Sequence, residues 1–118
     1  MKSMKTKPQK FEVWIADLNP QRGTEAGKIR PVVIIQSNLL NEHHPSTLVC
    51  PITTNVIPES YILRVNIPKG SAQLNDNSDV MIDQIRAIDN HRLLKKAGIL
   101  PPEIAEKISK NLAILLDL

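Results

Sequence analysis

The 118-residue chain contains one cysteine and only three aromatic residues, Phe11, Trp14 and Tyr61. Because Cys50 is alone, the chain can form no internal disulfide and no thiolate zinc cluster, which fits a reducing cytosol. No apolar run approaches the roughly 20 residues of a membrane-spanning helix, and no apolar signal segment follows the lysine-rich start. We therefore expect a cytoplasmic protein with a flexible basic tail over residues 1–10 and a single domain over residues 11–118.

The signatures of several common enzyme classes are also missing. The four glycines form no phosphate-binding loop, the histidines are not spaced for one helical turn, and no serine lies in a nucleophile-elbow pattern. The absence of these motifs disfavours nucleotide hydrolysis and metalloprotease chemistry, and we expect neither a metal nor another cofactor. A formal net charge of +3 and a pI near 9.2 are compatible with a polyanionic partner but do not by themselves indicate one.

Short β-rich segments separated by turn residues dominate the chain. Apolar and polar alternation predicts strands over residues 11–18, 31–36, 47–54, 61–67 and 80–88, with exposed loops over 21–29 and 37–45. Pro31 favours the start of a strand, and Pro51 indicates an edge or a bulge. Asn90 and Gly98 predict the two ends of a short helix over residues 91–97.

A second helix is predicted to begin at Pro101 and Pro102, because four apolar residues then recur at helical spacing: Ile104, Ile108, Leu112 and Leu115. Short strands closed by a terminal amphipathic helix indicate a fold that is mainly β with helices (α+β). Its expected form is a small antiparallel barrel.

The first candidate site is the segment from Glu25 to Pro31, in which a flexible loop brings a carboxylate and a guanidinium to the start of a buried strand. The planar fork of Arg30 can bind two phosphate oxygens at once, which suits the charge of a phosphoryl transition state. The alternative is a weak surface ion pair between Arg30 and Glu25.

Two further segments carry polar groups at predicted strand ends. Thr53 and Thr54 end an apolar strand, where ordinary strand filling is the alternative to a catalytic hydroxyl. Asp83, Gln84 and Arg86 interrupt the run 80–88 so that both of its faces mix apolar and polar groups. This mixture indicates a strand end near a cleft, with a structural salt bridge as the alternative.

His43 and His44 are candidates for acid and base in RNA cleavage, since imidazole is a common general acid and base in enzymes. Their polar loop beside Pro45 equally fits exposed spacer residues. Cys50, within an apolar strand, fits core filling better than a reactive thiolate.

Four segments together resemble the MazF/PemK family of toxins from toxin–antitoxin pairs: VWIADLNP, GTEAGKIRPVVIIQSN, PSTLVCPITTN and DVMIDQIRAIDNHRL. They occur in the family's order and spacing and span most of residues 11–94. The resemblance implies an SH3-like barrel, a homodimer, an acidic antitoxin partner, and metal-independent cleavage of single-stranded RNA at short preferred sequences. It places the catalytic arginine on Arg30 and the catalytic threonine on Thr53, with RNA-binding residues at Glu25, Lys28, Asp83, Gln84 and Arg86.

The chemistry implied by this resemblance needs few protein groups, because RNA carries its own nucleophile in the 2′-hydroxyl. An in-line attack would give a 2′,3′-cyclic phosphate and a 5′-hydroxyl, with Arg30 stabilising charge or donating to the leaving group and Thr53 orienting a phosphate oxygen. The general base is left open, and Glu25 is a candidate if loop closure desolvates it. Thr24 replaces the family's usual serine, and Ala26 replaces a frequent amide side chain, which bears on base preference.

Two other functions fit the same architecture. Gyrase-poisoning toxins of the CcdB type share a C-terminal Trp-Gly-Ile, whereas this chain ends in Leu-Asp-Leu and has its only tryptophan at position 14. In a non-catalytic RNA-binding barrel, Arg30 and Thr53 would contact phosphate without promoting cleavage.

Overall fold

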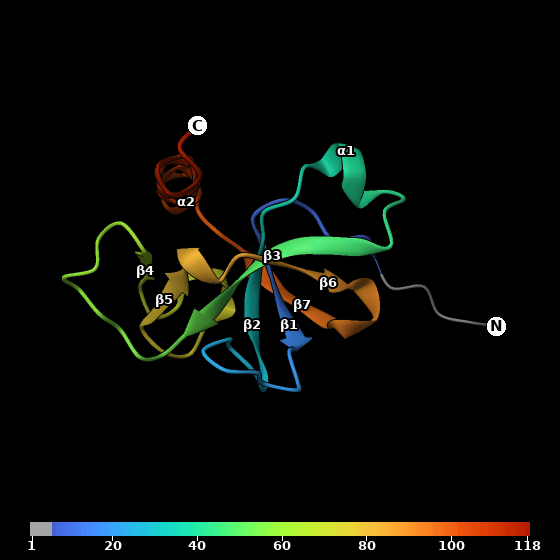
Figure 1. Cartoon of the computed structure of the whole chain (residues 1–118), viewed down its shortest axis with the longest axis horizontal. Coiled ribbons are helices and arrows are strands. Elements are labelled where there is room, and N and C mark those ends of the chain that lie inside the picture. The colour runs from blue at the N-terminus through green and yellow to red at the C-terminus, as the bar shows by residue number, and fades with distance from the viewer. Residues whose placement is uncertain (1–5) are drawn as a thin grey trace.

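The computed structural model describes residues 6–118 and arranges seven strands in one antiparallel sheet, with helix α2 packed against it (Figure 1). The strands are β1 (Glu12–Asp17), β2 (Ile29–Ile34), β3 (Ser46–Thr53), β4 (Arg64–Ile67), β5 (Ser78–Met81), β6 (Arg86–Asp89) and β7 (Leu93–Ile99). The helices are α1 (Asn38–Asn41), the 3-10 turns η1 (Ser71–Gln73), η2 (Ile82–Gln84) and η3 (Asn90–Arg92), and α2 (Pro102–Leu116). The expected mainly β class with a C-terminal helix is confirmed.

Strand β3 organises the sheet, whose order is β4-β5-β3-β2-β1-β7 with β6 also paired to β3. The first half of β3 pairs with β6, as far as Val49, and its last two residues pair with β5. Pro51 lies between these stretches and faces Val32 of β2. The expected edge position for Pro51 was wrong, because β3 has neighbours on both sides, and the proline lies where β3 changes partner.

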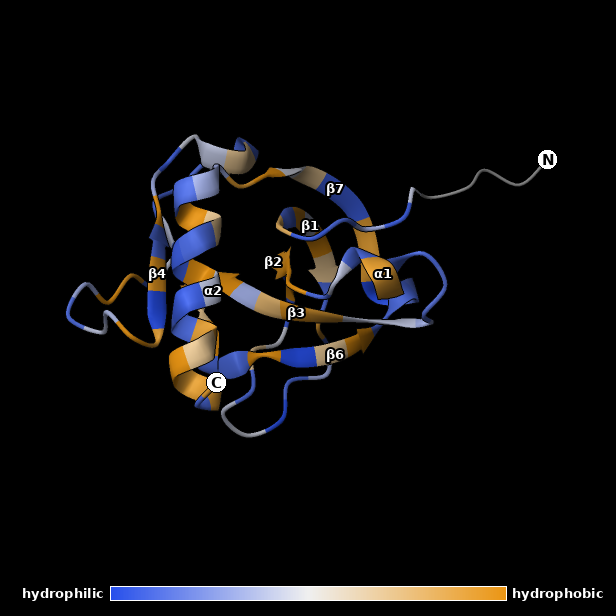
Figure 2. Ribbon diagram, turned by 90° about the horizontal axis from the view of Figure 1, so that it is seen from above, coloured by the Kyte–Doolittle hydropathy of each residue, from blue (hydrophilic) through white to orange (hydrophobic). Residues whose placement is uncertain are grey.

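The core has two layers on opposite faces of the sheet. One is built around Trp14, together with Val32, Val49 and Ile88. The other is covered by α2, whose Ile104 and Ile108 are buried and whose Leu112 and Leu115 are partly buried. The predicted apolar stripe is therefore confirmed, and Figure 2 shows its alternation with polar positions along α2.

Two expected elements have different structures. Residues 80–88 form two strands separated by the turn η2, so their mixed faces reflect a change of chain direction. The predicted helix 91–97 is wrong: only the turn η3 forms, capped by Asp89 rather than Asn90, and the chain continues as β7 beside β1. Tertiary pairing here overrides the local helix signals.

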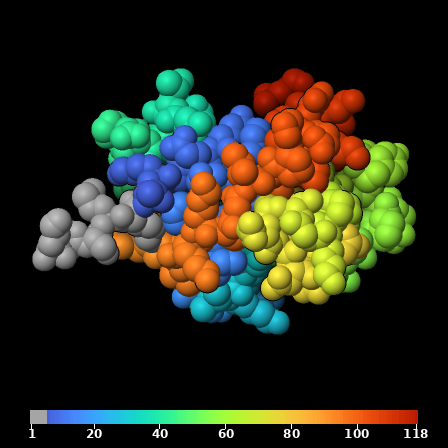
Figure 3. Space-filling model, turned by 180° about the vertical axis from the view of Figure 1, so that it is seen from behind, coloured from blue at the N-terminus to red at the C-terminus, as the bar shows by residue number. Residues whose placement is uncertain are grey.

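Gly98 has a packing role in β7 and not the helix-ending role expected of it. A Cβ at this position would lie 2.8 Å from the backbone carbonyl carbon and oxygen of Ala72, in the segment that contains η1. In Figure 3 this segment, coloured yellow, lies against the orange surface of β7. The close approach of two backbones therefore requires glycine.

The remaining differences are small. Strand β2 starts two residues before Pro31, and the loop 37–45 contains α1, whose first turn Ser37 caps by accepting from the Leu39 amide. Residues 1–5 of the expected basic tail lie outside the described residues, whereas the amides of Gln9 and Lys10 donate to Glu12 and Asn38. Within residues 6–118, no helix has the length and apolar character needed to cross a membrane.

Glu12 is a buried carboxylate at the start of β1. It accepts hydrogen bonds from the Trp14 indole at 2.9 Å and from the Gln9 amide at 2.9 Å, and it forms an ion pair with Lys96 at 2.8 Å. Burial acts to raise the pKa of Glu12, but the hydrogen bonds from Lys96, Trp14 and Gln9 outweigh it and hold the pKa below its ordinary value of 4.5.

We expect Glu12→Gln to lower the free energy of unfolding by about 1–2 kcal/mol near neutral pH, because bonds to a charged acceptor are lost. A carboxylate with a depressed folded pKa stabilises above its unfolded pKa, and this contribution disappears as pH falls through the folded value. The difference between wild type and variant should therefore shrink below about pH 4.5. Urea unfolding at several pH values, followed by circular dichroism, checks this, and a constant difference would contradict it.

Candidate functional site

Arg30 and Thr53 line one open pocket of about 320 Å³. The ladder between β2 and β3 ends at the pair Val32–Pro51, so Arg30 and Thr53 each lie two residues beyond it on neighbouring strands. The other lining residues are Lys28, Ile29, Pro31, Ile52 and Thr54. The two predicted catalytic residues and Lys28 are thus brought together.

The loop between β1 and β2 is held at several points by other parts of the chain. Gln84 uses both ends of its amide: Oε1 accepts from the Ala26 amide and Nε2 donates to the Thr24 carbonyl, each at 3.1 Å. At the base of the loop, the Lys28 amide donates to Asn19 Oδ1 at 3.0 Å. Residues 21–29 therefore form a braced loop, in which η2 fixes the segment that precedes Arg30.

The guanidinium of Arg30 is oriented by its own loop. Its Nε donates to the Gly27 carbonyl at 2.8 Å, and Lys28 between them has a left-handed φ of 68°. Across the described residues the two Nη nitrogens of Arg30 make no hydrogen bond or ion pair, and Glu25 is not its partner. The outer edge of the fork is therefore free to bind an anion.

The Thr53 hydroxyl has a defined acceptor role. Its Oγ1 accepts from the Asn55 amide at 3.1 Å, in a short turn that follows β3. Because a hydroxyl can accept and donate at once, this contact leaves the proton available for a phosphate oxygen.

The third group of predicted residues lies beside the pocket and does not line it. Asp83 is exposed on η2, and Arg86 begins β6, opposite Val49. Of the described residues, Arg86 alone has a buried side-chain nitrogen, Nη1, without a partner. The structural salt bridge considered for this segment is thus not present among the ion pairs of residues 6–118.

The other titratable candidates lie away from this chemistry. His43 and His44 are exposed beyond the end of β3 opposite to Thr53, and the eight-residue strand from Ser46 to Thr53 is roughly 23 Å long. Burial raises the pKa of the Cys50 thiol to about 12, with a smaller contribution from the Asp83 carboxylate. Cys50 is therefore core filling, as expected, and is not a thiolate at neutral pH.

Three residues near the pocket were not found from the sequence: Asn55, Arg64 and Asp79. Asp79 faces Thr53 across the β3–β5 ladder, and Arg64 is bonded to both Asp79 and Asn55. Asp79 is the last residue of a polar segment, residues 68–79, that separates two of the predicted strands, so no local signal indicated its burial.

Comparisons with known proteins agree with this architecture. Residues 9–116 match the family described as the PemK-like, MazF-like toxin of type II toxin-antitoxin systems. An endoribonuclease MazF from Staphylococcus saprophyticus is 35% identical over 107 residues, which cover 91% of this chain and 89% of that protein.

Solved structures share the fold across nearly the whole chain. MazF from Deinococcus radiodurans has a TM-score of 0.83 at 22% identity, covering 97% of this chain and 100% of the other. The Mycobacterium tuberculosis toxin MazF-mt6 has a TM-score of 0.76 at 25% identity, covering 91% and 97%. Because the family match spans residues 9–116, the chain belongs to the PemK-like, MazF-like toxins of type II toxin–antitoxin systems.

Proposed function

We propose that this toxin is an endoribonuclease that cleaves single-stranded RNA at short preferred sequences without a metal ion. The observation that carries the proposal is the shared pocket, which is lined both by Arg30, whose two Nη nitrogens are unbonded among the described residues, and by Thr53, whose hydroxyl is able to donate. The relative named endoribonuclease MazF, at 35% identity, supports the same activity.

In the proposed reaction, the 2′-hydroxyl oxygen attacks the adjacent phosphorus in line, while the bond from phosphorus to the 5′-oxygen breaks. The attacking hydroxyl loses its proton to a base, and the departing 5′-oxygen gains one from a general acid, for which Arg30 or a water molecule is available, so the products are a 2′,3′-cyclic phosphate and a 5′-hydroxyl. Arg30 stabilises the negative charge that develops on the phosphoryl oxygens, and Thr53 donates to one of them. Glu25, exposed in the braced loop, is our candidate base.

We assign RNA contacts to residues of the loop between β1 and β2, of η2 and of β6: Glu25, Lys28, Asp83, Gln84 and Arg86. Lys28 supports this assignment most directly, because it lines the pocket and supplies a phosphate-binding cation. The carboxylate and amide groups suit hydrogen bonding to the edges of unstacked bases, and aromatic residues for stacking are few.

The test is to incubate the purified protein with a mixed single-stranded RNA in EDTA and to map the new ends. Cuts at a restricted set of sequences that persist with the chelator are expected. Cleavage that stops in EDTA and returns with added Mg²⁺ would contradict the metal-independent step. Binding without any cut would favour the non-catalytic barrel.

We also propose that the toxin is a cytoplasmic homodimer that binds an acidic antitoxin. The net charge of +3 supports an acidic partner, as do solved MazE–MazF complexes from Deinococcus radiodurans, which share the fold. Affinity purification from the native host should recover an acidic protein, and recovery of basic partners alone would count against this. Light scattering at micromolar concentration tests the dimer, which a monomer mass would refute.

A further inference from the structure

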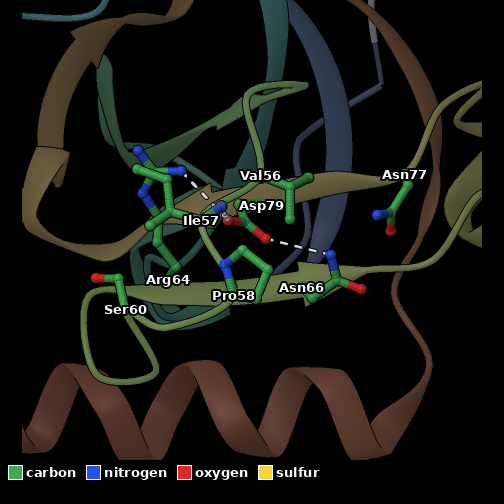
Figure 4. Close-up of a pocket in the computed structure, with 8 residues that line it drawn as sticks. All are labelled: Val56, Ile57, Pro58, Ser60, Arg64, Asn66, Asn77 and Asp79. Carbon is green, nitrogen blue, oxygen red and sulfur yellow. Dashed lines mark hydrogen bonds and ion pairs between the residues drawn. The ribbon is translucent and has the colours of Figure 1, made fainter.

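A buried ion pair lies beside the proposed cleavage site, in a second pocket of about 330 Å³. Asp79 is 2% exposed, and its Oδ2 contacts Arg64 Nη1 at 3.2 Å. Figure 4 shows the carboxylate between Arg64 and Asn66, on the strands above α2. An unpaired carboxylate at this depth would be strongly destabilising, so its partners define what it does.

The partners of the Asp79 carboxylate come from two segments, the loop after β3 and strand β4. Oδ2 also accepts from the Ile57 amide at 2.8 Å, and Oδ1 accepts from Asn66 Nδ2 at 3.2 Å. Through its backbone, Asp79 pairs with Thr53 of β3 and with Asn66 of β4. Asp79 therefore connects the strand that carries Thr53 to the loop that follows it.

Arg64 extends the network to the hydroxyl of Thr53. The nitrogen that contacts Asp79 also donates to the Asn55 carbonyl at 2.8 Å, and the Asn55 amide donates to Thr53 Oγ1 at 3.1 Å. Both groups of Asn55 in this chain of contacts belong to its backbone. The peptide groups around Asn55 are thus fixed between the guanidinium and the threonine.

This support is needed because the sheet ends at Thr53. The β3–β5 ladder contains only two pairs, Ile52–Val80 and Thr53–Asp79, and the chain then leaves the sheet as an exposed turn. A strand end without further ladder bonds would move freely. The Asp79 and Arg64 side chains supply the missing bonds to Ile57 and Asn55.

We propose that the Arg64–Asp79 pair is a positioning device for RNA cleavage, which acts through Asn55 to hold the Thr53 hydroxyl with its proton directed at the scissile phosphate. This inference rests on the proposed catalytic role of Thr53. Arg64 and Asp79 do not line the pocket of Arg30 and Thr53, so they are positioning residues and not catalytic ones.

The test removes the pair in two ways and measures kcat and KM for RNA cleavage. Asp79→Asn breaks the ion pair without changing the shape of the side chain. The double variant Arg64→Met/Asp79→Leu removes both charges and leaves no charge unpaired, so it can be measured if the single variant fails to fold. A misplaced catalytic group lowers kcat by about tenfold to a hundredfold, while KM should change less than about twofold.

Two additional measurements separate positioning from general stability. Amide hydrogen exchange without RNA should show lost protection at Ile57 and Asn55, and on a Thr53→Ala background the same changes should lower kcat by less than about twofold. Glu12→Gln is the matched control, since it disturbs another buried carboxylate paired with a cation but should leave kcat unchanged.

An unchanged kcat in the folded double variant, or a loss of equal size with and without Thr53, would overturn the positioning role while leaving the proposed cleavage intact. Unaltered amide exchange at Ile57 would show that the Arg64–Asp79 pair does not hold the loop after β3. A Thr53→Ala enzyme as fast as wild type would instead refute the role of Thr53 in the proposed function, and this inference with it.

Discussion

Replacing Arg30 by alanine is expected to slow RNA cleavage by at least about a hundredfold, the effect of removing one donor from a site that stabilises developing charge. The Arg30 side chain is fixed by the Gly27 carbonyl at Nε, and Arg30 lines the pocket that it shares with Thr53. Donors that are already in place, such as the Nη groups of Arg30, need no rearrangement when charge develops in the transition state. Their removal should therefore lower kcat.

The measurement is single-turnover cleavage of a defined RNA at saturating enzyme. Arg30→Lys should recover only part of the rate, because an ammonium cannot reproduce the two-pronged fork. Arg22→Ala is the matched control, since Arg22 is an exposed arginine of the same loop that does not line the pocket, and it should cleave at nearly the wild-type rate. A loss below about tenfold for Arg30→Ala would refute its assignment as the charge stabiliser.

The parts of the fold that could be predicted are those with strong local periodicity. The stripe of α2 and the apolar strands β1 to β3 bury residues whose spacing already indicates the buried face. Residues 91–97 could not be predicted in this way. Their capping signals favour a helix, but Leu93–Ile99 instead fills the sheet position beside β1, a partner about eighty residues earlier in the chain.

The residues themselves made Arg30 and Thr53 candidates at strand ends, and only the family resemblance assigned them catalytic roles, which remain predictions. Their meeting in one pocket could not be read from the sequence, since it depends on how β2 and β3 pair. Gln84 illustrates the same limit. The sequence placed it near the RNA, a role that remains a prediction, but gave no sign that its amide braces the Thr24 and Ala26 backbone.

Asp79 shows why supporting residues are the hardest to foresee. Nothing in a polar segment distinguishes an exposed aspartate from one that will be buried. Its burial follows from three long-range neighbours, Ile57, Arg64 and Asn66, that only the folded chain supplies. Residues that contact a ligand can be suggested by their chemical type and position in the sequence. Residues that position those side chains are recognised only from their contacts in the folded structure.

Replacing the ribose at the cut position by deoxyribose is expected to abolish cleavage at that link altogether. The proposed reaction has no nucleophile other than the 2′-hydroxyl. The Cys50 thiol does not replace it, because its pKa of about 12 keeps it protonated at neutral pH. The 2′-hydroxyl attacks a phosphorus atom of the same molecule and gains rate from this proximity. A water molecule attacking in its place would not have this advantage.

The experiment uses two RNAs of identical sequence, with one deoxyribose either at the cut link or at the next link downstream. The first should stay intact while still competing for the enzyme, because single-strand binding depends mainly on phosphates and bases. The second should be cut at the normal position to leave a 2′,3′-cyclic phosphate. Continued cleavage of the first RNA would require an external nucleophile. Arg30 and Thr53 would then stabilise a different transition state, in which the nucleophile is a group of the protein or a water molecule.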